Sequence, residues 1–377
     1  MLPAPNVSSP PTQVTLSAGF IGGGHPYSGT ADAVQYGAWR APSGEVGIIL
    51  VNITGSMLSA TIPVDFDRLK LVHGATYEAD IESSGTSASL GQLSDTKAYV
   101  IPLQPLEIAV VTVVAKQQPN YQGLWWASPA GSESGWGINF AHQGDIIFAT
   151  WFTYDTTGKA WWLSMTATKT APNVYSGALV QTHGPAFSAM PFDPGAVTHT
   201  VVGNATLTFT DANTAQFTYT VNGVAQAKTL VREAFGALPT CAFGTQPNLA
   251  LATNYQDLWW ASPAGSESGW GINLTEQSGV IFGTWFTYDV DGSPLWLSVT
   301  ATNTAPGIFT GTLVKTSGPS FSAMPFDPNK VMRTEVGSAT FAFRDGANAT
   351  FSYTVGNVNQ VKSITREVFV SPGTTCR

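Results

Sequence analysis

Carboxylates beside aromatic side chains are the residues of this sequence that most invite a catalytic interpretation. Hydrolysis of a glycosidic bond usually needs two carboxylates about 5–9.5 Å apart, flanking the bond. Two similar segments, 121–235 and 255–369, share carboxylates at equivalent positions, but most of these lie in turn sequences. Glu133 and its equivalent Glu267 differ, because each lies in a short loop next to a tryptophan. One carboxylate does not make an acid–base pair, so we predict no catalytic residue.

None of the histidines of the first segment has a histidine at the equivalent position of the second segment. The three histidines of the first segment and their equivalents in the second are His142/Glu276, His183/Ser317 and His199/Arg333. A histidine base, a Ser-His-Asp arrangement or a histidine metal site would therefore exist in one copy only. No Cys/His spacing resembles a zinc site. We predict neither a metal site nor a cofactor.

The tryptophans are the stronger signal. Adjacent residues of a strand face opposite sides, so one indole of the Trp125-Trp126 pair should lie inside the fold and the other outside. By the same alternation we expect Trp151 to face outward, and Glu233 to lie on the opposite face from Arg232. The outward indoles expected in the two segments are Trp126, Trp151 and Trp161, with Trp260 and Trp285 equivalent to the first two. Either they pack on a neighbouring domain or on the long connection 187–194, or they form a platform for a ligand or partner.

Groups suited to sugar recognition occur close together in both segments. Sugar rings offer flat C–H faces that stack on indole, and their hydroxyls hydrogen-bond to amide and carboxylate groups. The expected ligand-binding residues are Trp126, Glu133, Trp136, Asn139 and Trp151, with Trp260, Glu267, Trp270, Asn273 and Trp285 in the second segment. An alternative for Asn139 is a barrel-lining residue that hydrogen-bonds to the backbone. Two copies would increase avidity if both reached one polymer.

These residues lie on a long internal repeat. Residues 121–235 (repeat 1) align with 255–369 (repeat 2) at an offset of 134 without a gap, and about 70 of the 115 pairs are identical. Within a repeat, hydrophobic residues alternate with period two, and turn sequences recur every 8 to 14 residues. We predict that each repeat is an eight-stranded antiparallel meander barrel, with linkers at 117–120 and 236–254.

A different unit, residues 1–116, precedes the repeats and also reads as short strands, so we predict an all-β protein of three domains. Only 11% of the 377 residues are charged, with a net charge of −8 at pH 7. Nucleic-acid binding needs clustered Lys and Arg, which the sequence lacks. No apolar run approaches the ~20 residues of a membrane helix, so we expect no transmembrane segment.

The two cysteines, Cys241 and Cys376, each follow the last strand of a repeat. They could form one intramolecular bridge that ties the exits of the repeats together, or each could bridge outside the chain. A bridge would suit an oxidising exterior. Together with the low lysine content and the all-β pattern, this favours a secreted or cell-surface protein.

Three resemblances to known families accompany this interpretation. Trp125 with Arg232, and Trp259 with Arg366, resemble the Trp and Arg that close lipocalin- and avidin-type barrels, although Asp257 departs from the glycine that lipocalins place two residues before the Trp. The motifs 124–139, 151–155 and 202–235 resemble a Trp-Trp…Glu-Ser-Gly-Trp-Gly module of secreted proteobacterial proteins. Residues 32–116 are similar to the accessory β-sandwich of many glycoside hydrolases, which implies that the chain is the non-catalytic tail of something larger.

From these observations we predict a non-catalytic extracellular binding region that recognises polysaccharide by stacking on tryptophan. One alternative is a self-associating structural or adhesive surface protein, whose aromatic faces bind another copy of the chain. A further alternative is the capture of a small hydrophobic ligand inside the calycin-like barrels.

Overall fold

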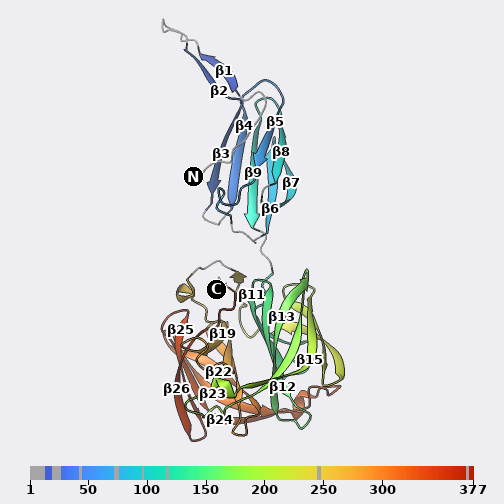
Figure 1. Ribbon diagram of the computed structural model, residues 1–377, viewed down its shortest axis with the longest axis vertical. Helices are drawn as coiled ribbons and strands as arrows, with labels where there is room; N and C mark the ends of the chain where they lie inside the picture. Colours follow the sequence, from blue (N-terminus) through green and yellow to red (C-terminus); the bar gives the residue numbers. More distant parts are fainter. Residues whose placement is uncertain are drawn as a thin grey trace. The chain divides into compact units, whose positions relative to one another are not determined.

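A computed structural model describes residues 13–18, 27–41, 45–71, 76–95, 97–115, 119–243, 248–370 and 373–377. The chain divides into two compact units, residues 1–118 and 119–377 (Figure 1). Both units are built from β-strands, as the sequence predicts. The two repeats lie together in the second unit rather than forming separate domains, and this packing determines where the candidate site lies.

The first unit is a sandwich of two sheets preceded by a hairpin. Its strands are β1 (Gln13–Ala18), β2 (Tyr27–Asp32), β3 (Val34–Arg40), β4 (Val46–Asn52), β5 (Leu58–Pro63), β6 (Tyr77–Ser83), β7 (Thr86–Leu93), β8 (Ala98–Leu103) and β9 (Ile108–Ala115). The larger sheet has the order β3-β4-β9-β6-β7, and β5 pairs with β8 in the smaller one. Alternate residues of β4, β5 and β9 are buried in a shared core.

Repeat 1 closes into an eight-stranded antiparallel barrel, barrel 1. Its strands are β10 (Gly123–Ala127), β11 (Gly137–Gln143), β12 (Ile146–Tyr154), β13 (Ala160–Ala171), β14 (Val174–His183), β15 (Thr198–Phe209), β16 (Thr214–Val221) and β17 (Val224–Arg232). The first and last strands pair, with Trp125 opposite Arg232, so the predicted meander is a closed barrel.

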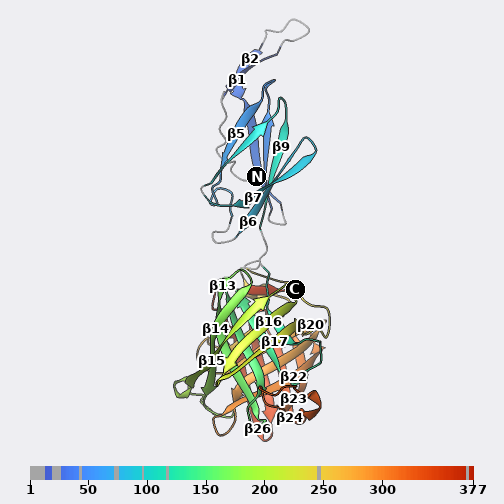
Figure 2. The ribbon, with the colours of Figure 1, turned by 90° about the vertical axis from the view of Figure 1, so that its right-hand side faces the viewer.

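Repeat 2 forms barrel 2 in the same way, with Trp259 opposite Arg366. Its strands are β19 (Asp257–Ala261), β20 (Gly271–Gln277), β21 (Val280–Tyr288), β22 (Pro294–Ala305), β23 (Ile308–Ser317), β24 (Met332–Phe343), β25 (Asn348–Val355) and β26 (Val358–Arg366). Figure 2 shows the strands of both barrels in a second view.

The two barrels pack through the outer faces of equivalent strands. Phe152 of β12 lies 5.0 Å, between ring centroids, from Trp296 of β22, and Phe286 of β21 lies 5.6 Å from Trp162 of β13. The indole N–H of Trp162 donates to the Thr287 carbonyl at 3.0 Å, and that of Trp296 donates to the Thr153 carbonyl at 2.9 Å. The contacts are reciprocal, so a pseudo-two-fold axis relates the repeats.

Each barrel is also plugged by a loop of the other. The Phe321 N–H donates to the Tyr154 carbonyl, and the Tyr219 hydroxyl of barrel 1 donates to the Phe321 carbonyl at 3.3 Å. In barrel 2, the Phe187 N–H donates to the Tyr288 carbonyl, and the Tyr353 hydroxyl donates to the Phe187 carbonyl at 2.7 Å. The Phe321 ring is buried against Trp151 and Trp161. Neither barrel is therefore complete without the other.

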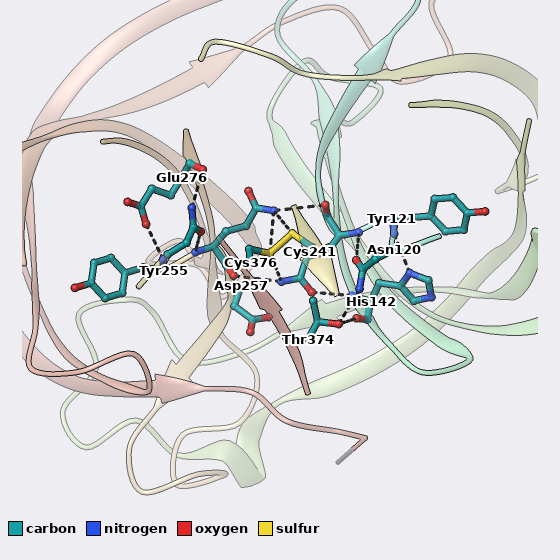
Figure 3. Close-up of a disulfide and its surroundings, with 12 residues drawn as sticks. Asn120, Tyr121, His142, Cys241, Tyr255, Asp257, Glu276, Thr374 and Cys376 are labelled. Carbon is teal, nitrogen blue, oxygen red and sulfur yellow. Dashed lines mark hydrogen bonds between the residues drawn. A yellow bond between two sulfur atoms is a disulfide. The ribbon is translucent and has the colours of Figure 1, made fainter. Parts of the chain in front are cut away.

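A disulfide between Cys241 and Cys376 links the exits of the two repeats (Figure 3). The cysteines face each other in a short sheet of β18 (Cys241–Phe243) and β27 (Thr374–Cys376). The side-chain amide of Gln122 donates to the Gln256 carbonyl, and that of Gln256 donates to the Gln122 carbonyl. Of the alternatives left open by the sequence, the intramolecular bridge is the one present.

Candidate functional site

Four of the tryptophans predicted to bind a ligand are buried. Trp151 and Trp285 do not face outward as predicted; they lie inside their barrels, and Trp151 packs on Phe217 and Tyr219 of β16. The prediction failed because β12 and β21 are buried on both faces, the outer one against the neighbouring barrel, so alternation alone does not tell inside from outside. The expectation that Trp161 faces outward is also wrong, because it packs under Phe321. Trp136 and Trp270 are only 5% exposed.

Glu133 and Glu267 have structural partners. The ammonium of Lys228 lies 2.6 Å from the Glu133 carboxylate, which also accepts a hydrogen bond from the Trp136 indole at 2.9 Å. Lys362, Glu267 and Trp270 repeat this arrangement with the same distances. The two lysines were missed from the sequence, although both repeats carry one at this position. These ion pairs hold the loops before β11 and β20. Glu133 and Lys228 also line a second cavity, of about 510 Å³, on barrel 1.

Asn139 and Asn273 lie in the packed region between the barrels. The Asn273 amide donates to the Thr150 hydroxyl at 2.7 Å, which joins β20 to β12 of the other repeat. The residues are 2% and 5% exposed. The prediction that they contact a ligand is therefore wrong. The side-chain nitrogen of Asn139 donates no hydrogen bond within the described part of the chain, so it does not donate to the backbone as the alternative for Asn139 supposed.

The Trp–Arg pairs occupy the barrel ends. The Arg232 guanidinium lies 4.9 Å from the centre of the Trp125 ring, and Arg366 lies 5.2 Å from that of Trp259. These are the contacts that the lipocalin resemblance implied. Asp257, which departs from that pattern, forms a buried ion pair with Arg366 at 3.0 Å. Asp257 in place of the lipocalin glycine thus adds an ion-pair partner for Arg366, and Arg366 still lies over the Trp259 ring.

Two of the predicted ligand residues, Trp126 and Trp136, line a groove of about 310 Å³ at one junction between the barrels. Trp126 is half-buried there. The groove is lined by Trp126, Ser134, Gly135, Trp136, Phe152 and Glu233 from repeat 1, and by Phe282, Trp296, Ser298, Thr300, Thr312, Val314, Thr316, Val331 and Arg333 from repeat 2. In the described part of the chain, the Trp126 indole N–H has no hydrogen-bond partner. Trp260, its equivalent, has the same exposure and an unpaired N–H.

The strand geometry explains why these side chains converge. Ser298 and Thr300 alternate along the outer face of β22, and Thr312 and Val314 do so along β23, so the outer surface of barrel 2 forms a floor rich in hydroxyl groups. Glu233 follows directly after β17 and joins the groove from barrel 1. Partial burial raises the pKa of its carboxyl to about 7, and none of the described residues donates a hydrogen bond to it. Arg333 lies exposed among the lining residues.

The groove combines aromatic surface, hydroxyl groups and one carboxyl group. Such a mixture of apolar walls with a few polar groups is typical of ligand sites, and the volume lies at the lower end of their usual range of about 300–1,000 Å³. Glu233 is the carboxylate among the lining residues. Within the described ranges, no group of three or more His, Cys, Asp or Glu side chains could hold a metal ion, and no helix is long and apolar enough to cross a membrane.

Comparison with known proteins adds no functional assignment. No family model matches the chain, and no curated protein matches it. A solved structure from work on botulinum neurotoxin type C, whose cell entry depends on interaction with two ganglioside molecules, aligns at a TM-score of 0.13 and 9% identity, over 91% of this chain and 92% of that chain. At that TM-score the likeness carries no argument about fold or function.

Proposed function

We propose that this chain is a non-catalytic, extracellular binding region that holds a saccharide segment of a polysaccharide in the groove between its barrels. The observation that carries the proposal is the half-buried Trp126, whose indole borders a floor of Ser and Thr hydroxyls. An indole offers a flat apolar face on which a sugar ring can stack. The disulfide supports the extracellular location.

Two alternative functions have less support in the structure. Self-association was inferred from outward aromatic faces, but of the indoles expected there, Trp151, Trp161 and Trp285 are buried within the second unit. Capture of a hydrophobic ligand needs an open barrel, whereas Trp151 and its neighbours fill the interior and Phe321 covers it. A hydrolase would need a second carboxylate near Glu233, and the groove lining supplies one alone.

The test is a pull-down of the purified chain on insoluble cellulose, chitin, xylan and mannan. We expect retention on at least one polymer, and loss of retention in the double variant Trp126→Ala/Trp260→Ala. Trp39→Ala is the matched control, because Trp39 is an indole 39% exposed on β3 of the first unit. Loss of binding in the control alone would move the site to the first unit. No retention of the wild type on any polymer would overturn the proposal, and larger species at higher concentration in size-exclusion chromatography would favour self-association.

A further inference from the structure

The groove has a counterpart at the other junction of the pseudo-two-fold pair. Resting on the proposed function, we infer that residues around Trp260 form a second saccharide site, so that one chain binds two ligand segments. The second groove would be lined by Trp260 and Glu367 from repeat 2 and by Ser164, Thr166 and Thr182 from repeat 1. These are the positions equivalent to Trp126, Glu233, Ser298, Thr300 and Thr316 at the offset of 134.

The walls of the two junctions are built alike. A Cβ atom placed on Gly135 would lie 2.5 Å from Cγ2 of Val331, and one placed on Gly269 would lie 2.5 Å from Cγ2 of Val197. The Tyr154 hydroxyl donates to the Gly135 carbonyl, and the Tyr288 hydroxyl donates to the Gly269 carbonyl. Each loop before Trp136 or Trp270 therefore meets the partner barrel in the same way. The glycines are needed there because a side chain would collide with the facing valine.

The lining side chains also match in exposure. Thr166 is exposed and Ser164 is half-buried, as are their equivalents Thr300 and Ser298. The Trp260 indole N–H, like that of Trp126, is buried without a partner in the described part of the chain. The two junctions thus share the same half-buried indole with a buried, unpaired N–H. Burial raises the pKa of Glu367 to about 7, as it does for Glu233.

Two of the lining positions differ between the junctions and make the sites unequal. Thr312 and Arg333 of the first groove correspond to Ala178 and His199 in the second. The second site therefore lacks one hydroxyl and the guanidinium with its several donors. Each hydrogen bond lost weakens ligand binding by about 2- to 10-fold. We expect a tighter site at Trp126 and a weaker one at Trp260.

Isothermal titration of the full chain with cellotriose, chitotriose, xylotriose and mannotriose tests this inference, because a trisaccharide is too short to serve both grooves. With the sugar whose polymer retains the chain, the wild type should bind two equivalents. Trp126→Ala should leave one weaker site, Trp260→Ala one tighter site, and the double variant none. Thr300→Tyr and Thr166→Tyr place a bulky ring on an exposed strand face, so they should block one groove each and still fold.

The outcomes separate the two proposals. One equivalent for the wild type, unchanged by Trp260→Ala and Thr166→Tyr, would overturn the second site and leave the proposed function standing. Binding of two equivalents that neither blocking variant reduces would place both sites elsewhere, and would overturn both the inference and the groove assigned under the proposed function. No binding of any trisaccharide and no retention on any polymer would overturn the proposed function together with the inference.

Discussion

Removal of the Phe321 ring should strongly lower the stability of the second unit. Phe321 is 5% exposed and inserts between Trp151, at 6.1 Å, and Trp161, at 5.3 Å between ring centroids. Phe→Ala in a packed site costs about 3–5 kcal/mol, because both transfer free energy and cavity formation contribute. The hydrogen bonds that the backbone of residue 321 makes with the Tyr154 carbonyl and the Tyr219 hydroxyl are kept in Phe321→Ala, so the loss of stability reports the removal of the ring alone.

Phe187→Ala is the matched comparison, because Phe187 plugs barrel 2 in the same way. Phe187 is less buried, and it contacts Trp285 at 6.0 Å and Tyr353 at 6.5 Å. The equivalent of Trp161 in repeat 2 is Leu295, so this plug lacks one indole. An aromatic pair contributes about 0.5–1.5 kcal/mol beyond burial. We therefore expect about 4 kcal/mol for Phe321→Ala and about 2–3 kcal/mol for Phe187→Ala.

Urea unfolding followed by tryptophan fluorescence measures both costs. Trp39 is the one tryptophan of 12 outside residues 119–377, so the signal reports the barrels. Because each barrel is completed by a loop of the other, we expect one transition with an unchanged m-value and a lowered midpoint. A cost below about 1 kcal/mol for Phe321→Ala, or a larger cost for Phe187→Ala, would refute the account of the plugs.

Two further predictions concern the disulfide and the groove carboxyls. Cys241→Ser/Cys376→Ser removes a bridge with a sequence separation of 135, so its free energy of unfolding, measured in urea, should be lower by about 2–4 kcal/mol. Addition of a reductant should cause the same loss in the wild type. Equal urea midpoints for the variant and the wild type would contradict this. Because the pKa of Glu233 and Glu367 is raised from 4.5 to about 7, the folded protein holds their protons more tightly than the unfolded chain. The free energy of unfolding should therefore fall as pH rises from about 4.5 through about 7. The variant Glu233→Gln/Glu367→Gln should reduce this fall and raise the urea midpoint at pH 8. An unchanged pH profile in this variant would show that other groups cause the pH dependence.

The sequence was sufficient to predict each barrel but not the way they pack. Period-two alternation and turn residues located all eight strands of each repeat, because every barrel strand buries one face in its own core. Alternation failed for Trp151 and Trp285, since the strands that carry them are buried on the outer face as well. The ion pair of Glu133 was not predicted for a related reason: Lys228 lies 95 residues away, and the closed barrel brings it near.

The groove could not be found by reading one repeat at a time. Glu233 was expected on the opposite face from Arg232, but nothing within repeat 1 shows that β22 and β23 of repeat 2 face it there. Arg333 was noted from the sequence only as the replacement for a histidine. A site composed of two copies needs their relative placement, which pairwise identity does not supply. Trp126 was found because its exposure follows from simple alternation next to the buried Trp125.

Differences between the repeats fall at two kinds of position. His142 accepts a hydrogen bond from the Tyr121 N–H, and Glu276 accepts the equivalent bond from the Tyr255 N–H. Burial lowers the pKa of His142 to about 3, so it is neutral and suited to that acceptor role. Two different side chains thus meet the same backbone requirement. By contrast, no described side chain hydrogen-bonds with Thr312, Arg333 or their equivalents, so these positions can vary without loss of structure. They are where two saccharide sites on one duplicated scaffold would acquire different affinities.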